Sequence, residues 1–227
     1  MEQMTPQSES AEQAALISTL RLVDSVMRIF ARSDIGPPPD VQSRPAIYAG
    51  NHRSLADLLL ASIAFHSWGL PIRPLVASSY FRKPVIGPLL GRLRCIPVGG
   101  SEALELATAE IQAGWSVAIM PEGRVVPVED WKADGVGQLR SGVGRLALET
   151  GLPVVATGAS GTEAFWPRGA TGPRVRPWRR YPLAVRSEVV GVIDAGSPRE
   201  ATEVVRTALV RCVERADTAT ELMRQSR

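Results

Sequence analysis

The sequence predicts an α/β fold: a single domain with a mixed, mainly parallel sheet flanked by helices and preceded by an amphipathic N-terminal helix. Short apolar runs alternate with amphipathic stretches, the order expected of strands and crossover helices in a parallel sheet. The 227 residues, 44% of them hydrophobic, suit one large domain with a sizeable core. A stiff Gly-Pro-Pro-Pro run at 36–39 follows the first helical pattern. We therefore expect an N-terminal segment at 1–35 and the main domain at 40–227.

The first element is a helix from about residue 11 to residue 32, after a polar start (residues 1–10) that we expect to be disordered. Its apolar side chains recur at spacings of three and four and share one face: Leu16, Leu20, Val23, Met27 and Phe30. This face fits either a helix packed on the domain or an amphipathic segment resting on a membrane. We expect neither a signal peptide nor a membrane span, because the start is polar and the apolar runs are short.

The main domain then alternates between strands and helices. Strands are expected at 46–50, 73–77, 95–98, 115–120, 152–157 and 189–193, and helices at 54–68, 101–113, 138–150 and 198–223. The last helix has the clearest start, since Ser197 is a good N-cap, Pro198 suits the first helical position and Glu200 completes a capping box.

Composition narrows the classes of function. A net charge of +3 would help contact with anionic lipid or an acidic protein, but it does not indicate a nucleic-acid-binding protein. Cys95 and Cys212 form neither a disulfide framework nor a metal-binding pattern. We expect them to be reduced thiols, which favours a cytosolic setting.

Residues 164–187 differ from the rest because they are rich in arginine and contain no acidic residue. Aromatic side chains lie between the arginines: Arg168, Arg174, Arg176, Arg179, Arg180 and Arg186, with Trp166, Trp178 and Tyr181. The stretch fits a solvated loop and hairpin. It also fits a docking surface for phosphate-bearing lipid or for an acidic carrier protein.

A histidine and an aspartate lie five positions apart at the predicted turn between strand 46–50 and helix 54–68, in the run Asn-His-Arg-Ser-Leu-Ala-Asp at 51–57. A neutral imidazole such as that of His52 can take a proton from a hydroxyl near neutral pH, and the Asp57 carboxylate can orient the ring. Asp57 would alternatively only stabilise the helix N-terminus, with His52 incidental.

A second polar turn, Pro-Glu-Gly-Arg at 121–124, follows the predicted strand 115–120. Gly123 lets a ligand approach the backbone closely, and the guanidinium of Arg124 can bind phosphate through two hydrogen bonds. Taken alone, the turn fits a surface turn with a routine ion pair better than it fits a binding site.

Together these stretches resemble the glycerolipid acyltransferases of the lysophosphatidic acid acyltransferase type. Residues 51–57 are similar to that family's N-H-x-S-x-x-D (HxxxxD) motif, and 121–124 to its F-P-E-G-T-R motif. Residues 83–98 resemble the block between them, which ends in I-P-V-D-R. Residues 139–155 resemble the closing block, F-K-x-G followed by A-x-x-x-G-x-P-V-V-P. The blocks occur in the family's order over about residues 44–160, and the fold that they imply is like that of glycerol-3-phosphate acyltransferase.

The resemblance implies a reaction and its participants. His52 would be the general base and Asp57 its partner, with the substrate bound by Asn51, Ser54, Glu122, Gly123 and Arg124. The acyl donor would be acyl-CoA or acyl-carrier protein, and the acceptor a lysophospholipid such as 1-acylglycerol-3-phosphate. No cofactor and no metal are expected. The enzyme would be peripheral to the inner face of the cell membrane, and the apolar stretch 84–93 would line an acyl channel.

One departure from the family pattern concerns the acceptor. Where the family carries an arginine after I-P-V, this chain has Gly99 and Gly100, and in the family that arginine contacts the acceptor phosphate. For a phosphate-bearing acceptor, Arg92, Arg94 or the cluster 174–180 would have to supply the missing positive charge. Otherwise the acceptor is a specialised metabolite or an aminolipid. A non-catalytic module that binds lipid or carrier protein is a further alternative.

Overall fold

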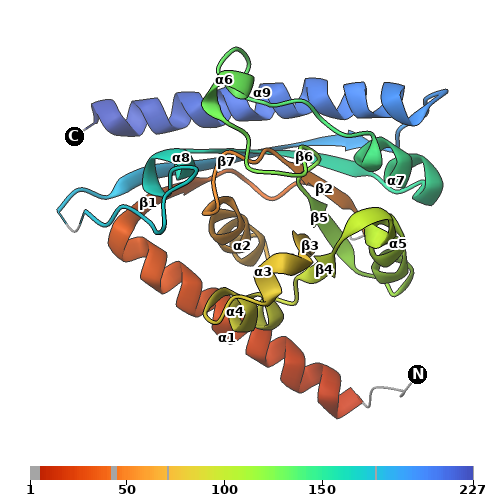
Figure 1. The fold of residues 1–227 in the computed structure, drawn as a ribbon, viewed down its shortest axis with the longest axis horizontal. Coiled ribbons are helices and arrows are strands. Elements are labelled where there is room, and N and C mark those ends of the chain that lie inside the picture. Colours follow the sequence, from red (N-terminus) through yellow and green to blue (C-terminus); the bar gives the residue numbers. More distant parts are fainter. Residues whose placement is uncertain (1–5, 42–44, 71, 177, 227) are drawn as a thin grey trace.

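The computed structural model describes residues 6–41, 45–70, 72–176 and 178–226. Within these ranges seven strands form one sheet in the order β1-β7-β6-β2-β5-β3-β4 (Figure 1). All neighbouring pairs are parallel except β6 and β7, which confirms the mixed, mainly parallel sheet. The strands are β1 (Ala31–Ile35), β2 (Ile47–Gly50), β3 (Ile72–Ala77), β4 (Ile96–Val98), β5 (Ser116–Ile119), β6 (Val154–Ser160) and β7 (Tyr181–Gly191).

Helices cover both faces of this sheet. The long helix α9 and the shorter α7 lie on one face, and α1 and α2 lie on the other (Figure 1). The helices are α1 (Pro6–Phe30), α2 (Asp57–Ser67), α3 (Ser78–Phe81), α4 (Ile86–Arg92), α5 (Ala103–Gln112), α6 (Val128–Trp131), α7 (Gly142–Thr150), α8 (Thr162–Phe165) and α9 (Pro198–Gln225), with a 3-10 turn at Gly100–Glu102.

The central strand β2 shows how the sheet divides the core. Tyr48 points towards α2 and meets Phe65 edge-on, with 5.6 Å between the ring centroids. Ile47 and Ala49 point to the opposite face and pack in the cluster that includes Val205 of α9. Alternation along the strand thus buries both faces of β2 and holds its carboxyl end rigidly.

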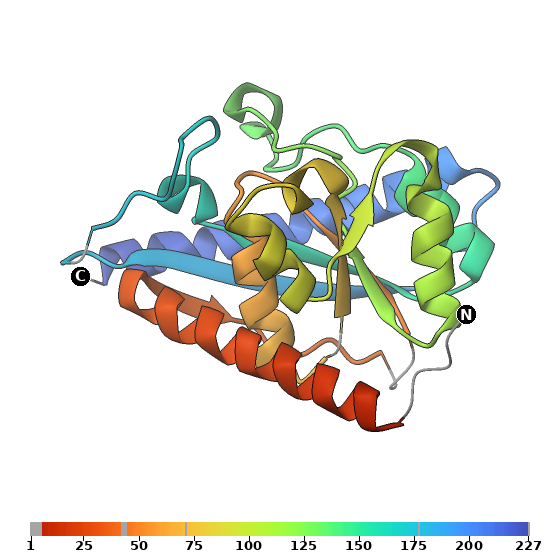
Figure 2. The ribbon, with the colours of Figure 1, turned by 60° about the horizontal axis from the view of Figure 1, so that its bottom comes forward.

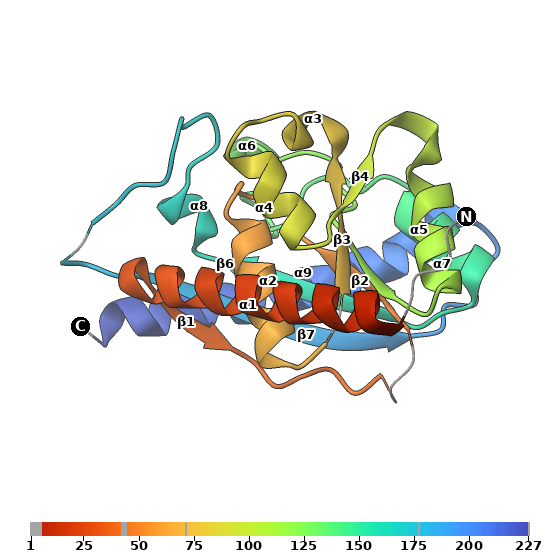
Figure 3. The same cartoon turned by 90° about the horizontal axis from the view of Figure 1, so that it is seen from below.

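The predicted apolar face of α1 packs against the domain, since Leu16, Val23 and Met27 are buried. The other side of the helix is not uniformly polar: Ile17, Leu22, Val26 and Ile29 are exposed. Figure 3 shows α1 lying across the sheet and the helices of this face. No helix in the described ranges has the length and apolar content that crossing a membrane requires.

The boundaries of α1 and β7 differ from the prediction. The helix α1 begins at Pro6, inside the start that we expected to be disordered, and residues 1–5 lie outside the described residues. It ends at Phe30, and Ala31–Ile35 forms β1, which pairs with β7 in a parallel register. The strand β7 begins at Tyr181, eight residues before its predicted start at 189. All five residues from Tyr181 to Val185 are buried, and the surrounding arginines and prolines obscured this apolar run in the sequence.

The N-cap prediction for the last helix is confirmed, because the Ser197 side chain accepts a hydrogen bond from the backbone N–H of Glu200. The capping box is not complete, since the Glu200 carboxylate accepts the backbone N–H of Gly196 and not that of Ser197. In contrast, α7 begins at Gly142 and not at 138, since the chain from 121 to 141 forms a long loop that contains α6. This loop lies over the edge of the sheet at which β2 and β5 end.

Candidate active site

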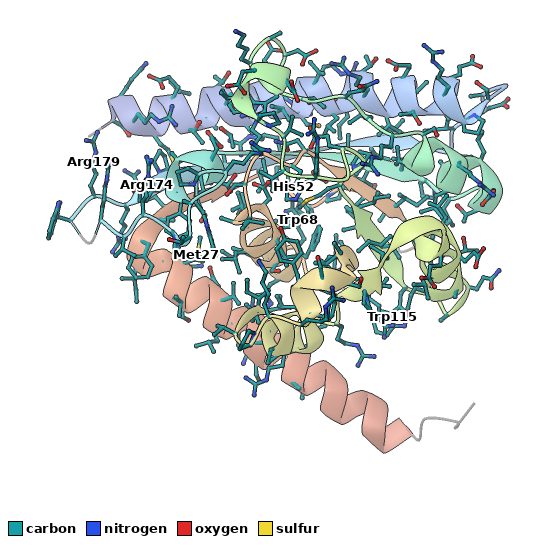
Figure 4. The ribbon with its side chains drawn as sticks, in the orientation of Figure 1. Met27, His52, Trp68, Trp115, Arg174 and Arg179 are labelled. Atoms are coloured by element: carbon teal, nitrogen blue, oxygen red, sulfur yellow. The ribbon has the colours of Figure 1, made fainter. Side chains whose placement is uncertain are left out.

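The two polar turns meet at one edge of the sheet. The strand β2 ends at Gly50 and leads into the 51–56 loop, while β5 ends at Ile119 and leads into the 121–124 turn. Because β2 and β5 are parallel neighbours, both turns leave from their carboxyl ends. Figure 4 shows His52 at this position in the middle of the molecule.

His52 and Asp57 form the pair expected from their spacing. Nδ1 of His52 lies 3.0 Å from Oδ2 of Asp57, with 19% of the histidine side chain and 1% of the aspartate side chain exposed. Oδ2 also accepts the backbone N–H of Ser54 at 2.8 Å. Within the described residues Nε2 of His52 has no hydrogen bond, so the pair can orient the ring and accept a proton at Nε2.

Glu122 lies beneath the same loop and is almost completely buried. Its Oε2 accepts the backbone N–H of His52, and its Oε1 accepts that of Gly137 at 2.8 Å. Burial raises the pKa of this carboxyl above its usual value, and the two backbone donors oppose the rise. The side chain therefore links the histidine loop to the loop 121–141.

Asn51 and Ser54 are also buried and bonded to the backbone. The amide of Asn51 pairs with Ala159, donating to its carbonyl at 3.0 Å and accepting its N–H at 2.7 Å. The hydroxyl of Ser54 donates to the carbonyl of Trp166 at 2.7 Å. The polar atoms of Asn51, Ser54 and Glu122 are hydrogen-bonded to the protein itself. Their contact with a substrate therefore stays a prediction.

Arginines border the turn at 121–124. Gly123 has a φ of +70°, and a Cβ there would lie 3.0 Å from Nε of Arg140, so the absence of a side chain lets Arg140 approach the turn. Arg124 is 61% exposed and pairs with Asp130 at 3.1 Å. Arg168 donates to the carbonyl of Val125 at 3.2 Å. Positive charge therefore gathers next to the His52 loop.

The sequence analysis named other arginines that could replace the family arginine absent at positions 99 and 100, and their positions differ from that of His52. Arg94 lies 5.8 Å from the ring of Trp115, which directly precedes β5. Because His52 lies beyond the carboxyl end of the neighbouring strand, Arg94 is at the opposite end of the strands from it. Figure 4 shows Arg174 and Arg179 in a segment well to the side of His52. Arg140 and Arg124 are therefore closer to the His52 loop than these arginines are.

Two further residues of this site were missed by the sequence analysis. Thr162 of α8 donates its hydroxyl hydrogen to Oδ1 of Asp57. Arg53, next to His52, is buried and binds both carboxylate oxygens of Asp217 in α9, at 2.8 and 3.0 Å. It also lies 4.1 Å from the ring centroid of Trp131. No local spacing could reveal either contact, since the partners are more than 100 residues apart in the sequence.

The described part of the chain holds no group of three or more His, Cys, Asp or Glu side chains that could bind a metal ion. The groups placed for chemistry at this edge are thus the imidazole–carboxylate pair and the neighbouring guanidinium groups.

Residues 34–160 match the protein-family model described as Acyltransferase, which is more than half of the chain. The fold is similar to the crystal structure of the 1-acyl-sn-glycerophosphate (LPA) acyltransferase, PlsC, from Thermotoga maritima, with a TM-score of 0.68. The two sequences are 20% identical, and the match covers 93% of this chain and 83% of that chain. Among curated proteins none matches this sequence.

Proposed function

Because this chain belongs to the acyltransferase family, we propose that it moves a fatty acyl group from the thioester of acyl-CoA or acyl-carrier protein to a substrate hydroxyl, with His52 as general base. The observation that carries this role is the 3.0 Å contact between Nδ1 of His52 and Asp57. It holds the ring through Nδ1, so that Nε2, which has no hydrogen bond within the described residues, can take the proton.

The reaction requires one proton to move and return. Nε2 of His52 takes the hydroxyl proton while the acceptor oxygen attacks the thioester carbonyl carbon. The Asp57 carboxylate stabilises the imidazolium that forms. The carbon–sulfur bond of the tetrahedral intermediate then breaks, and His52 gives the proton to the leaving thiolate. The products are an ester and a free thiol, without a covalent acyl-enzyme.

The proposed acceptor is a lysophospholipid such as 1-acylglycerol-3-phosphate. The guanidinium groups of Arg124 and Arg140 support it, because they flank Gly123 and can bind phosphate through paired hydrogen bonds. The fold likeness to a 1-acyl-sn-glycerophosphate acyltransferase supports the same choice.

A second candidate is acyl transfer to a hydroxyl acceptor without phosphate. Gly99 and Gly100 favour it, since they offer no charge at the positions after Ile-Pro-Val. Assays with 1-acylglycerol-3-phosphate and with the matching monoacylglycerol separate the two candidates. A preference for the monoacylglycerol would contradict the phospholipid proposal.

We also propose that the enzyme works at the inner face of the cell membrane. The exposed apolar side chains of α1, which include Leu22, Val26 and Ile29, support this location. The arginine segment, residues 168–176 and 178–180, lies at the same end of the molecule as the C-terminal end of α1 (Figures 1 and 3). It bears an exposed tryptophan, Trp178. Binding to vesicles that contain anionic lipid measures this association.

The catalytic role is tested by replacing His52 and the only other histidine, His66 of α2. We expect His52→Ala to lower kcat by roughly 100- to 10,000-fold, because the general base is lost. Asp57→Asn should also lower kcat severely, whereas His66→Ala should leave it unchanged. Folding of each variant is checked by circular dichroism. Near-normal turnover by folded His52→Ala protein would refute the mechanism.

A further inference from the structure

The Asp57 carboxylate receives hydrogen bonds from two distant parts of the chain. Its Oδ2 is shared between Nδ1 of His52 and the backbone N–H of Ser54, all within one loop. Its Oδ1 accepts the hydroxyl of Thr162, which lies 105 residues further along the sequence. Thr162 and the carboxylate are both buried, so water does not substitute for either group.

The chain between β6 and α8 is shaped to deliver this hydroxyl. After Ser160 the backbone turns at Gly161 with a φ of +88°, and a Cβ there would lie 2.1 Å from the carbonyl oxygen of Pro182. Only glycine therefore allows β6 to turn this close to β7. Thr162 follows directly as the first residue of α8 and faces Asp57 across the sheet edge.

The other end of α8 is bonded to the same catalytic loop. The backbone N–H of Trp166 donates to the carbonyl of Thr162 at 2.8 Å, and the carbonyl of Trp166 accepts the hydroxyl of Ser54 at 2.7 Å. The short helix thus contacts the loop through Thr162 and Trp166. This arrangement fixes the position of the Thr162 hydroxyl relative to both oxygens of Asp57.

We propose that Thr162 is a positioning residue for acyl transfer, acting through Asp57 on His52. Its hydrogen bond to Oδ1 prevents the carboxylate from rotating, so that Oδ2 stays directed at Nδ1 of His52. Thr162 thereby donates a hydrogen bond to the buried oxygen that His52 does not reach. The threonine proton stays on its oxygen throughout, and His52 alone carries the substrate proton. The proposal rests on the general-base role of His52 proposed above.

The test compares three variants, each of which changes one buried threonine side chain. Thr162→Val removes the hydroxyl and keeps the shape of the side chain, and Thr162→Ser keeps the hydroxyl. Thr157→Val is the matched control. Thr157 lies on β6, is buried, and its hydroxyl has no hydrogen-bond partner within the described residues. The melting temperature of each variant is measured beside kcat and the KM values of donor and acceptor.

We expect Thr162→Val to lower kcat by roughly 10- to 100-fold, because a hydrogen bond to a charged group is lost, with both KM values within about twofold of wild type. Thr162→Ser should restore kcat to within about threefold of wild type, and Thr157→Val should match wild type. Equal kcat in Thr162→Val and Thr157→Val would overturn the proposal. A rise in KM without a fall in kcat would also overturn it, since that pattern indicates a role in substrate binding. Full activity of His52→Ala would instead refute the proposed function on which it rests.

Discussion

The two halves of the candidate site differ in how firmly the protein holds them. In the acid–base half, Asn51, Ser54, Asp57 and Glu122 are buried, and each is hydrogen-bonded to a backbone group or to a neighbouring side chain. In the arginine half, Arg124 is 61% exposed and pairs with a carboxylate that is itself 45% exposed. Rigid, prearranged groups need no reorganisation during the chemical step, so the first half suits catalysis. The second half is free to adapt, and it suits the choice of acceptor.

Among the residues that support the His52–Asp57 pair, Glu122 should give the largest effect when it is replaced. Glutamine has one acceptor oxygen in place of two, so Glu122→Gln leaves one of the two backbone N–H groups, of His52 or Gly137, without a partner. We expect kcat to fall roughly 100-fold and the free energy of unfolding to fall by about 2 kcal/mol. Steady-state kinetics and chemical denaturation measure the two effects. The control is Glu129→Gln, an exposed carboxylate on α6. If kcat of Glu122→Gln fell by threefold or less and matched kcat of the control, the Glu122 carboxylate would be dispensable for turnover.

The buried half also shows how far the sequence could lead. The pairing of His52 with Asp57 was predictable, because five residues span a strand-to-helix turn and the partners are local. Thr162 and Arg53 were not predictable, because their contacts depend on how β6, α8 and α9 pack on the loop. An arginine is expected from sequence to be exposed, whereas Arg53 is buried, paired with Asp217 and packed against the ring of Trp131.

The same limit applies to the fold. The central strands were predictable from short apolar runs that are buried on both faces. The edge strand β1 was not, because Ala-Arg-Ser-Asp-Ile has no strand-like alternation and acquires its conformation by pairing with β7.

A smaller effect is expected from Asp217, which supports the catalytic loop from α9. The guanidinium of Arg53 is 2% exposed, whereas the Asp217 carboxylate is 44% exposed. Asp217→Ala should lower the free energy of unfolding by about 2 kcal/mol, because a buried charge loses its partner while water can still reach the site. Denaturant titration measures the change. Glu221→Ala, on the same helix and in an exposed pair with Arg224, should cost less than about 1 kcal/mol.

The double variant Arg53→Met with Asp217→Leu provides the decisive check on that interpretation. Removing both charges should recover part of the stability lost in Asp217→Ala, because no unpaired charge stays buried. If the double variant were less stable than Asp217→Ala, the Arg53–Asp217 ion pair would itself stabilise the fold. The unpaired charge of Arg53 would then not explain the stability lost in Asp217→Ala.

In the arginine half, changes should alter the acceptor and spare the chemical step. We expect Arg140→Ala to raise KM for 1-acylglycerol-3-phosphate by about tenfold, because one charged hydrogen-bond donor to phosphate is lost. KM for the acyl donor and kcat at saturation should change little. Arg145→Ala on α7 is the control, since Arg145 is also exposed and pairs only with Glu149 within the described residues. If KM for monoacylglycerol, which has no phosphate, rose equally, Arg140 would not act by binding phosphate.

The smallest effect is expected at the arginine segment, which extends away from the sheet in Figure 2 and whose Arg174 and Arg179 lie well to the side of His52 in Figure 4. Trp178 is 90% exposed, and a tryptophan among arginines suits the headgroup level of an anionic membrane. Trp178→Ala should weaken binding to vesicles that contain anionic lipid by about fivefold, with kcat on a short-chain, water-soluble substrate unchanged. The control, Val204→Ala, removes a 43% exposed apolar side chain from α9, on the opposite face of the sheet from α1. If vesicle binding were unchanged in Trp178→Ala while KM for acyl-carrier protein rose, the segment would bind the acidic carrier and not the membrane.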